Sequence, residues 1–257
     1  MWKTLRISVL LLILVIVAGR TWLERVETRS WKNPLWVGIY PLNGDGSASA
    51  QRYIADLTPE TFTGIGTFFE REAHRYGIAL EEPIHIELYP QGTRLPPQLA
   101  RDAGPLDVMW WSLEMRWFAM RAAEVPDRTP PRIRIFVLYH DPTSLQSIPD
   151  SHGLQKGLVG TVHAFAVQNM AGRNNIVIAH ELLHTLGATD KYALGSGAPL
   201  YPDGFAEPER QPRYPQPNAE IMAGRRALSA TDFDMPTGLR DVVVGPLTAS
   251  EIRWTHH

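Results

Sequence analysis

Two histidines and a glutamate in the segment IAHELLHTLGATD are the residues best placed to do chemistry. His180 and His184 are four residues apart, so in a helix their imidazoles lie on one face and can bind a single ion. Glu181 projects at a different angle, where it is a poor third ligand but can contact a water bound to that ion. Zinc lowers the pKa of such a water to about 7, so a carboxylate can accept its proton at neutral pH. The pattern therefore predicts two metal ligands and a general base on one helical turn.

A third ligand is predicted a few residues further along. Gly187 tolerates a positive φ and allows a sharp turn, after which Asp190, six residues past His184, can return to the ion. Three protein ligands plus water is the composition of a catalytic zinc site. The alternatives are that Asp190 is a turn residue paired with Lys191, and that the histidines are half-buried and satisfied by other partners. Because the chain has no cysteine, any metal must be held by histidine, carboxylate or water.

The stretch HELLHTLGATD resembles H-E-x-x-H-x-x-G-x-x-D, the zinc-binding pattern of metzincin-like metallopeptidases of the snapalysin type, whose third ligand is aspartate. In the commoner metzincins the last position is histidine. The family also has a methionine-containing turn beneath the metal, and NAEIMAG, with Met222, is similar to it. The resemblance covers about residues 174–224. It implies a twisted sheet over the active-site helix, with an edge strand that binds extended substrate. The segment GLVGTVHAFAV would be that strand, and its His163 either approaches the cleft or faces the sheet.

The resemblance implies a zinc-dependent metallopeptidase in which His180, His184 and Asp190 hold one Zn²⁺ and Glu181 is the catalytic base. The expected substrate is a peptide or protein. One alternative is a zinc hydrolase of a non-peptide amide or ester with the same ligands. Another is a non-catalytic, membrane-tethered module with structural zinc, closed by a fourth protein ligand such as Glu207, Glu209 or Glu220. An oxyanion donor could come from any of Tyr192, Tyr201 and Tyr214.

The elements that must position these residues follow from periodicity and turn residues. Strands are predicted at 35–46, 83–90, 132–140 and 157–167, and helices at 58–77, 104–125, 174–186 and 246–254. The helix at 104–125 is expected to be buried, with core positions for Trp110, Trp111 and Trp117. Thr248 is expected to cap the last helix. Proline and glycine crowd residues 193–217, so irregular chain is expected there. Together with what the resemblance implies, the expected fold class is α+β and zincin/metzincin-like: a twisted mixed sheet over an active-site helix, then a loop-rich C-terminal part with one short helix.

The N-terminus predicts a membrane segment. Residues 1–29 form a signal anchor or signal peptide with a short linker, because Lys3 and Arg6 precede the apolar run 7–19. Residues 30–257 are then a single metallopeptidase-like domain on the periplasmic or extracytoplasmic side of a single-pass anchor; the alternative is a secreted or periplasmic form after cleavage. The chain of 257 residues has a net charge of −2 with both signs scattered, which gives no basic surface for nucleic acid.

Overall fold

The structure, a computed structural model, describes residues 6, 19, 28–100, 103–122, 125, 128–143, 152–154 and 158–255. The signal anchor or signal peptide predicted in residues 1–29 therefore lies almost entirely outside the described residues. Across the part of the chain that the structure describes, no helix is both long and apolar enough to span a membrane.

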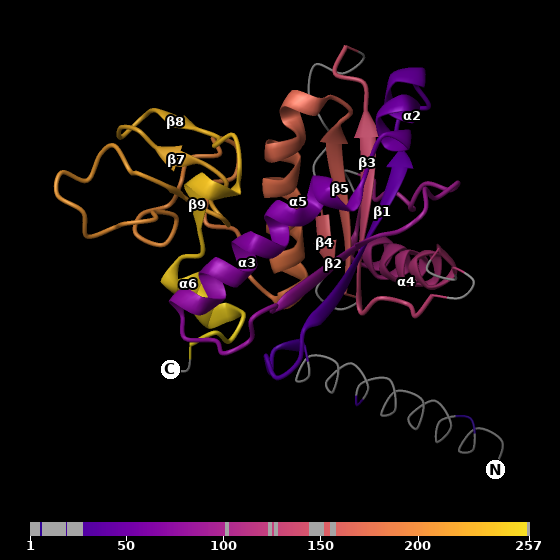
Figure 1. Cartoon of the computed structure of the whole chain (residues 1–257), viewed down its shortest axis with the longest axis horizontal. Helices are drawn as coiled ribbons and strands as arrows, with labels where there is room; N and C mark the ends of the chain where they lie inside the picture. Colours follow the sequence, from indigo (N-terminus) through magenta and orange to yellow (C-terminus); the bar gives the residue numbers. More distant parts are fainter. Residues whose placement is uncertain are drawn as a thin grey trace.

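A five-stranded sheet forms the centre of the molecule (Figure 1). Its order is β2 (Ile84–Leu88), β1 (Leu35–Asn43), β3 (Ile133–His140), β5 (Val159–Phe165) and β4 (His152–Leu154). The first four strands are parallel, and β4 runs antiparallel to β5. The expected mixed sheet is confirmed. The expectation that the strand at 157–167 forms the edge is wrong, because β5 lies between β3 and β4, and the short β4 was not predicted.

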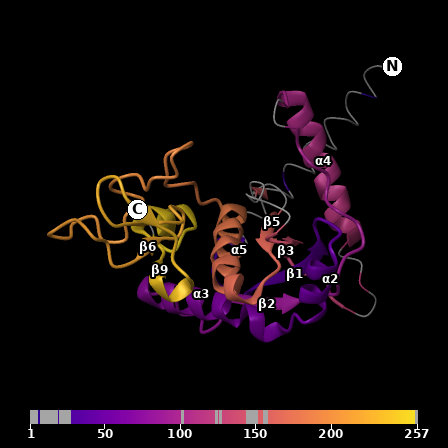
Figure 2. The ribbon, with the colours of Figure 1, turned by 90° about the horizontal axis from the view of Figure 1, so that it is seen from above.

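Helices cover both faces of the sheet, as parallel strands require of their crossover connections (Figures 1 and 2). Helices α3 (Thr63–Arg75) and α5 (Ala171–Leu186) pack on one face, and α4 (Pro105–Ala122) packs on the other. Alternation along β1 builds both cores. Ile39 points toward α3 and α5, whereas its neighbour Tyr40 points toward α4.

The helices differ from expectation mainly at their ends. The predicted helix at 58–77 is divided into a 3₁₀ turn η1 (Pro59–Phe62) followed by α3. Helix α5 begins at Ala171, three residues earlier than predicted, and a further helix, α2 (Ala48–Ala55), was not predicted at all. Ser47 caps α2 by accepting a hydrogen bond from the Ala50 amide at 3.1 Å.

The prediction that α4 is buried is wrong. Only Met115 and Ala119 are buried in this helix, and Trp110 and Trp117 are 63% and 54% exposed. Trp111 is partly buried, and its indole donates to the Pro97 carbonyl at 2.8 Å. The helix carries apolar residues on both faces, and a single sheet face can cover only one of them.

The C-terminal part is loop-rich, as expected, with small paired strands and one short helix (Figure 1). Its elements, with the 3₁₀ turn that precedes α5, are η3 (Gln168–Met170), β6 (Ala219–Glu220), β7 (Arg226–Ala227), β8 (Phe233–Asp234), η4 (Leu239–Asp241), β9 (Val242–Val243) and α6 (Pro246–Glu251). The expected cap at Thr248 is wrong: Gly245 occupies the N-cap position, and the Thr248 hydroxyl donates to buried Glu220 at 2.7 Å.

Candidate metal centre

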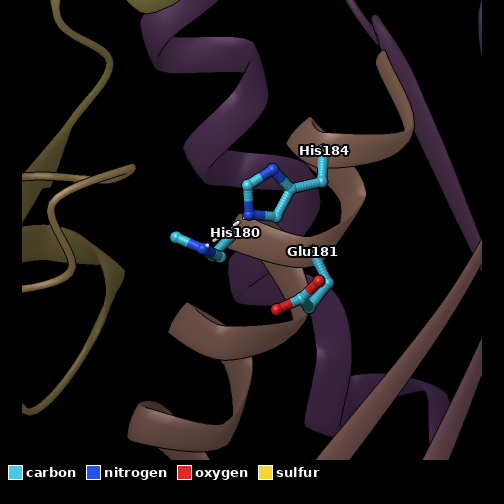
Figure 3. Close-up of side chains that lie close together, drawn as sticks. All are labelled: His180, Glu181 and His184. Carbon is cyan, nitrogen blue, oxygen red and sulfur yellow. Dashed lines mark hydrogen bonds between the residues drawn. The ribbon is translucent and has the colours of Figure 1, made fainter. Parts of the chain in front are cut away.

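Helix α5 presents both histidines on one face, as their spacing predicts (Figure 3). The Nε2 atoms of His180 and His184 are 3.0 Å apart, and the two rings are nearly perpendicular. Glu181 lies beside them, and one possible ligand atom from each of the three residues falls within 4.8 Å of the others. One turn of helix therefore brings two imidazoles and a carboxylate together.

Asp190 reaches the same point from beyond the end of the helix. Gly187 ends α5 in the left-handed conformation, with φ of 100°, which lets the chain turn back. The Oδ1 atom of Asp190 then lies 3.2 Å from Nε2 of His180 and 3.1 Å from Nε2 of His184. Lys191 does not pair with Asp190, because its ammonium group binds Glu251 at 2.8 Å.

The hydrogen bonds of the histidines define which nitrogen is free for a metal. The Nδ1 atoms of His180 and His184 lie 3.0 and 2.9 Å from the carbonyl oxygens of Ile221 and Ala188. A carbonyl only accepts, so each Nδ1 carries a proton, and in the neutral ring each Nε2 presents a lone pair. In metal-binding histidines, a hydrogen bond at the ring nitrogen that does not bind the metal orients the imidazole.

The three converging atoms fit a tetrahedral metal ion. They form a triangle with edges of 3.0, 3.1 and 3.2 Å. Ligands about 2.0–2.1 Å from a tetrahedral zinc are about 3.3 Å from each other, so small adjustments would accommodate the ion. Lone pairs this close repel unless a proton or a cation lies between them, and the donor set of two imidazoles and a carboxylate suits zinc.

Glu181 is buried beside this triangle, and one oxygen of its carboxylate lacks a hydrogen-bond partner among the described residues. It is 4% exposed, and within the described chain its Oε2 atom has no hydrogen-bond partner. Burial raises the pKa of Glu181, and His180 and His184 oppose this rise. A buried carboxylate costs free energy unless it is bonded, so the vacant Oε2 fits a role that engages a further polar group, such as a water.

The charges of the centre are strongly coupled. Burial would raise the pKa of Asp190, but hydrogen bonds from His180 and His184 outweigh burial and lower it. Burial also lowers the pKa of His180, and here the hydrogen bond to Asp190 and the charge of Glu181 prevail and raise it. The ligand set therefore attracts a positive charge, which a divalent cation would supply more fully than a proton.

The turn at 219–224, which the sequence resemblance identifies as the methionine-containing turn, packs against the centre. Met222 is completely buried, and its carbonyl accepts a hydrogen bond from the Lys191 amide at 2.9 Å. Ile221 next to it supplies the acceptor for His180. Buried Glu220 holds the turn, because its carboxylate accepts from the Ala223 and Gly245 amides at 2.9 and 3.0 Å.

The candidate fourth ligands are engaged elsewhere or exposed. Glu220 uses one carboxylate oxygen within its own turn and the other at the start of α6, and Glu207 pairs with Arg210 at 3.1 Å. Glu209 is exposed to solvent. Among the residues that the structure describes, the histidine cluster gains no third carboxylate beyond Glu181 and Asp190.

Of the three tyrosines that the sequence offers as oxyanion donors, Tyr192 lies nearest to the histidines. Its ring centroid is 6.5 Å from that of His180. Tyr201 and Tyr214 instead pack against Phe205, at 5.5 and 5.9 Å between ring centroids.

His163 lies on the other face of the sheet. Its Nδ1 atom is 2.9 Å from Nε2 of His140, and the two rings stack. Strand alternation explains this, because its neighbours Val162 and Ala164 point into the core on the α5 side. His163 faces the sheet's α4 side and does not approach the candidate centre.

Two contacts at the centre carry no signal in the sequence. A side chain at Gly160 of β5 would clash with Ile135, at 2.7 Å from a Cβ built there, and would contact Glu181, whose Cβ lies at 3.8 Å. Glu251 binds both Thr189 and Lys191, which flank Asp190. Both contacts join residues far apart along the chain, which a local pattern cannot reveal.

No family model matches this sequence, and no curated protein matches it. The geometry of His180, Glu181, His184 and Asp190 is therefore the evidence from which a function can be argued.

Proposed function

We propose that this protein is a zinc-dependent metallopeptidase that hydrolyses peptide bonds. The observation that carries the proposal is the convergence of Asp190 with His180 and His184, beside a buried glutamate whose Oε2 atom has no partner within the described chain. Three protein ligands that leave a fourth position open are typical of catalytic zinc, whereas structural zinc is closed by four.

Each residue of the centre has a distinct role in this proposal. His180, His184 and Asp190 would hold the ion, and their hydrogen-bonded partners would keep the imidazoles in the binding tautomer. A Zn²⁺ ion held by these residues would lower the pKa of a bound water and polarise the scissile carbonyl. Glu181 accepts the proton of the attacking water at its buried carboxylate and later delivers it to the nitrogen of the leaving amine.

Strand β4 is the proposed binding edge for an extended substrate. Among the described strands it is the outermost on that side of the sheet, and its Gly153 lies opposite Gly160 of β5. A side chain at Gly160 would contact Glu181, because a Cβ built there lies 3.8 Å from the Glu181 Cβ. A peptide added as a further strand along β4 would therefore run close to the general base, and backbone pairing of this kind recognises extended peptides of varied sequence.

The arrangement around the centre supports a metzincin-like reading of the fold. A mixed sheet packs over α5, and the buried Met222 turn lies against the histidines, as the resemblance implies. The non-catalytic alternative is disfavoured by Glu181, because a structural site has no use for a buried carboxylate oxygen that lacks a partner among the described residues.

The test is the substitution Glu181→Gln in the full chain. Glutamine preserves size and helix propensity and leaves the three ligands in place, but it cannot accept the proton. Cleavage of a peptide library should fall about 10²–10⁴-fold, with zinc content unchanged. The exposed Glu207→Gln is the matched control and should cleave like the parent. A chelator should stop cleavage by the parent. Equal cleavage by Glu181→Gln and the parent would remove Glu181 from the mechanism.

A further inference from the structure

The outward face of α4 carries an uninterrupted apolar stripe. Its residues recur at helical spacing and are each 51–75% exposed: Leu106, Met109, Trp110, Leu113, Trp117 and Met120. On a helix of 3.6 residues per turn they fall within a sector of about 100°, along a length of about 21 Å. Monomeric soluble proteins rarely expose a contiguous apolar surface of this kind without a partner.

The helix cannot rotate to bury this stripe. Its opposite face carries Met115 and Ala119, which pack into the second core against Tyr40 and Phe136 of the sheet. Phe118 reinforces this contact, with its ring centroid 4.9 Å from that of Phe136. Figure 2 shows α4 on the far side of the sheet from α5, so no described element covers its outer face.

We propose that this stripe lies in the interfacial layer of an anionic lipid bilayer. Its composition of leucine, methionine and tryptophan suits that layer, where indole rings are favoured between hydrocarbon and water. Arg116 and Arg121 lie at the two edges of the stripe on the helical wheel. The Arg121 guanidinium sits 4.3 Å from the Trp117 ring centroid. Arginines in these places can reach lipid phosphates while the apolar residues enter the bilayer.

The chain itself favours a bilayer over a second copy as the occupant. The apolar run predicted to enter the membrane, residues 7–19, ends only eight residues before the continuously described chain begins at Thr28. Eight extended residues span at most about 29 Å, so a chain anchored by this run holds its folded part within reach of the lipid surface. Trp36, 46% exposed, lies on the same sheet face as α4 by strand alternation and adds an aromatic side chain there.

Docking through α4 would set the orientation of the proposed peptidase. Because α4 and α5 pack on opposite faces of the sheet, the candidate metal centre would face away from the lipid. This corollary rests on the proposed function. The docking itself does not, since it concerns residues that share no contact with the centre.

The test uses the absence of cysteine in the chain. Leu113→Cys in the full chain would carry an environment-sensitive nitrobenzoxadiazole label, and Leu194→Cys, at a position 88% exposed in the C-terminal part, is the matched control. Both are reconstituted in phosphatidylcholine vesicles containing phosphatidylglycerol and spin-labelled lipid. The label at position 113 should be quenched several-fold more than the label at 194. Circular dichroism and zinc content check that each variant keeps the parent's fold.

Three results would overturn the proposal. Equal quenching at positions 113 and 194 would show that α4 stays in water. A second result is that the label at 113 is shielded from water without being quenched by lipid, and only when each vesicle carries several copies of the chain. That result would assign the stripe to a second copy of the chain. Equal quenching with and without phosphatidylglycerol would show that the stripe does not require anionic lipid. Unchanged quenching in Arg116→Glu/Arg121→Glu would lead to the same conclusion. Neither Arg belongs to the candidate metal centre, so failure here leaves the test of Glu181 unaffected.

Discussion

Glu251 in the last helix binds Lys191, with 2.8 Å between the Lys191 Nζ atom and the Glu251 carboxylate. The same carboxylate accepts from the Thr189 amide and hydroxyl, at 3.0 and 2.6 Å. Lys191 is 3% exposed, so its charge is compensated inside the protein. Glu251 thereby holds both neighbours of Asp190 and fixes the turn that carries the third candidate ligand.

Glu251→Ala should weaken zinc binding without removing any ligand. Loss of a group that orients a ligand typically lowers metal affinity about 10–100-fold. Competition with a chromophoric chelator, at a temperature where the variant remains folded, measures this effect. Glu207→Ala is the control, because it also removes a glutamate from an ion pair, but this pair, with Arg210, lies at the surface. This variant should bind zinc as the parent does. An unchanged affinity in Glu251→Ala would mean that Asp190 keeps its position without this contact.

The intact chain should contain about one zinc ion, and either His180→Ala or His184→Ala should lose most of it, because each supplies one of three ligands. His163→Ala is the control: it removes one member of the histidine pair on the other face of the sheet and should retain the metal. Metal analysis of the purified parent and of the three variants measures their zinc content. Absence of metal from the unmutated protein after chelator-free purification would refute the site.

Zinc affinity should fall with acidification, led by the histidines. Only the neutral imidazole binds metal, and in the metal-free protein the pKa of His180 is raised by Asp190 and Glu181 despite its burial. The pKa of Asp190 is lowered, so this carboxylate stays ionised and is not the group that releases the metal. Affinity should therefore be steady at alkaline pH and decline as the pH falls through the raised pKa of His180, so the decline begins above the ordinary histidine value of about 6.5 and amounts to up to tenfold per pH unit. Isothermal titration across this range checks it, and a constant affinity down to about pH 5 would contradict histidine ligation.

Met222→Ala should destabilise the fold and loosen the centre together. Met222 is fully buried next to Ile221, whose carbonyl orients His180. Truncating a buried methionine costs about 2–5 kcal/mol, whereas Met222→Leu keeps the volume and should cost less than about 1.5 kcal/mol. Urea unfolding of the zinc-free form measures the loss of fold stability. Comparison with the zinc-bound form measures the loosening of the centre. Equal stability of the alanine variant and the parent would show that this turn does not support the histidines.

The sequence alone determined the parts of the centre that depend on local periodicity. His180, Glu181 and His184 lie within about one turn of a single helix, so their relative geometry follows from the helix itself. Gly187 ends that helix because a positive φ is required there, and the four main strands follow from their apolar alternation and turn residues.

Tertiary structure decided what local patterns cannot encode. Both neighbours of Asp190 are bonded to Glu251, sixty-one residues after Asp190, and the place of β4 outside β5 depends on pairing between strands. Helix α4 has two apolar faces, and its sequence cannot state which one meets the sheet; packing against Phe136 buries Met115 and leaves Trp117 outside. The reason is the same in each case: burial and pairing are properties of segments that meet in space, whereas spacing within a segment specifies only its own geometry.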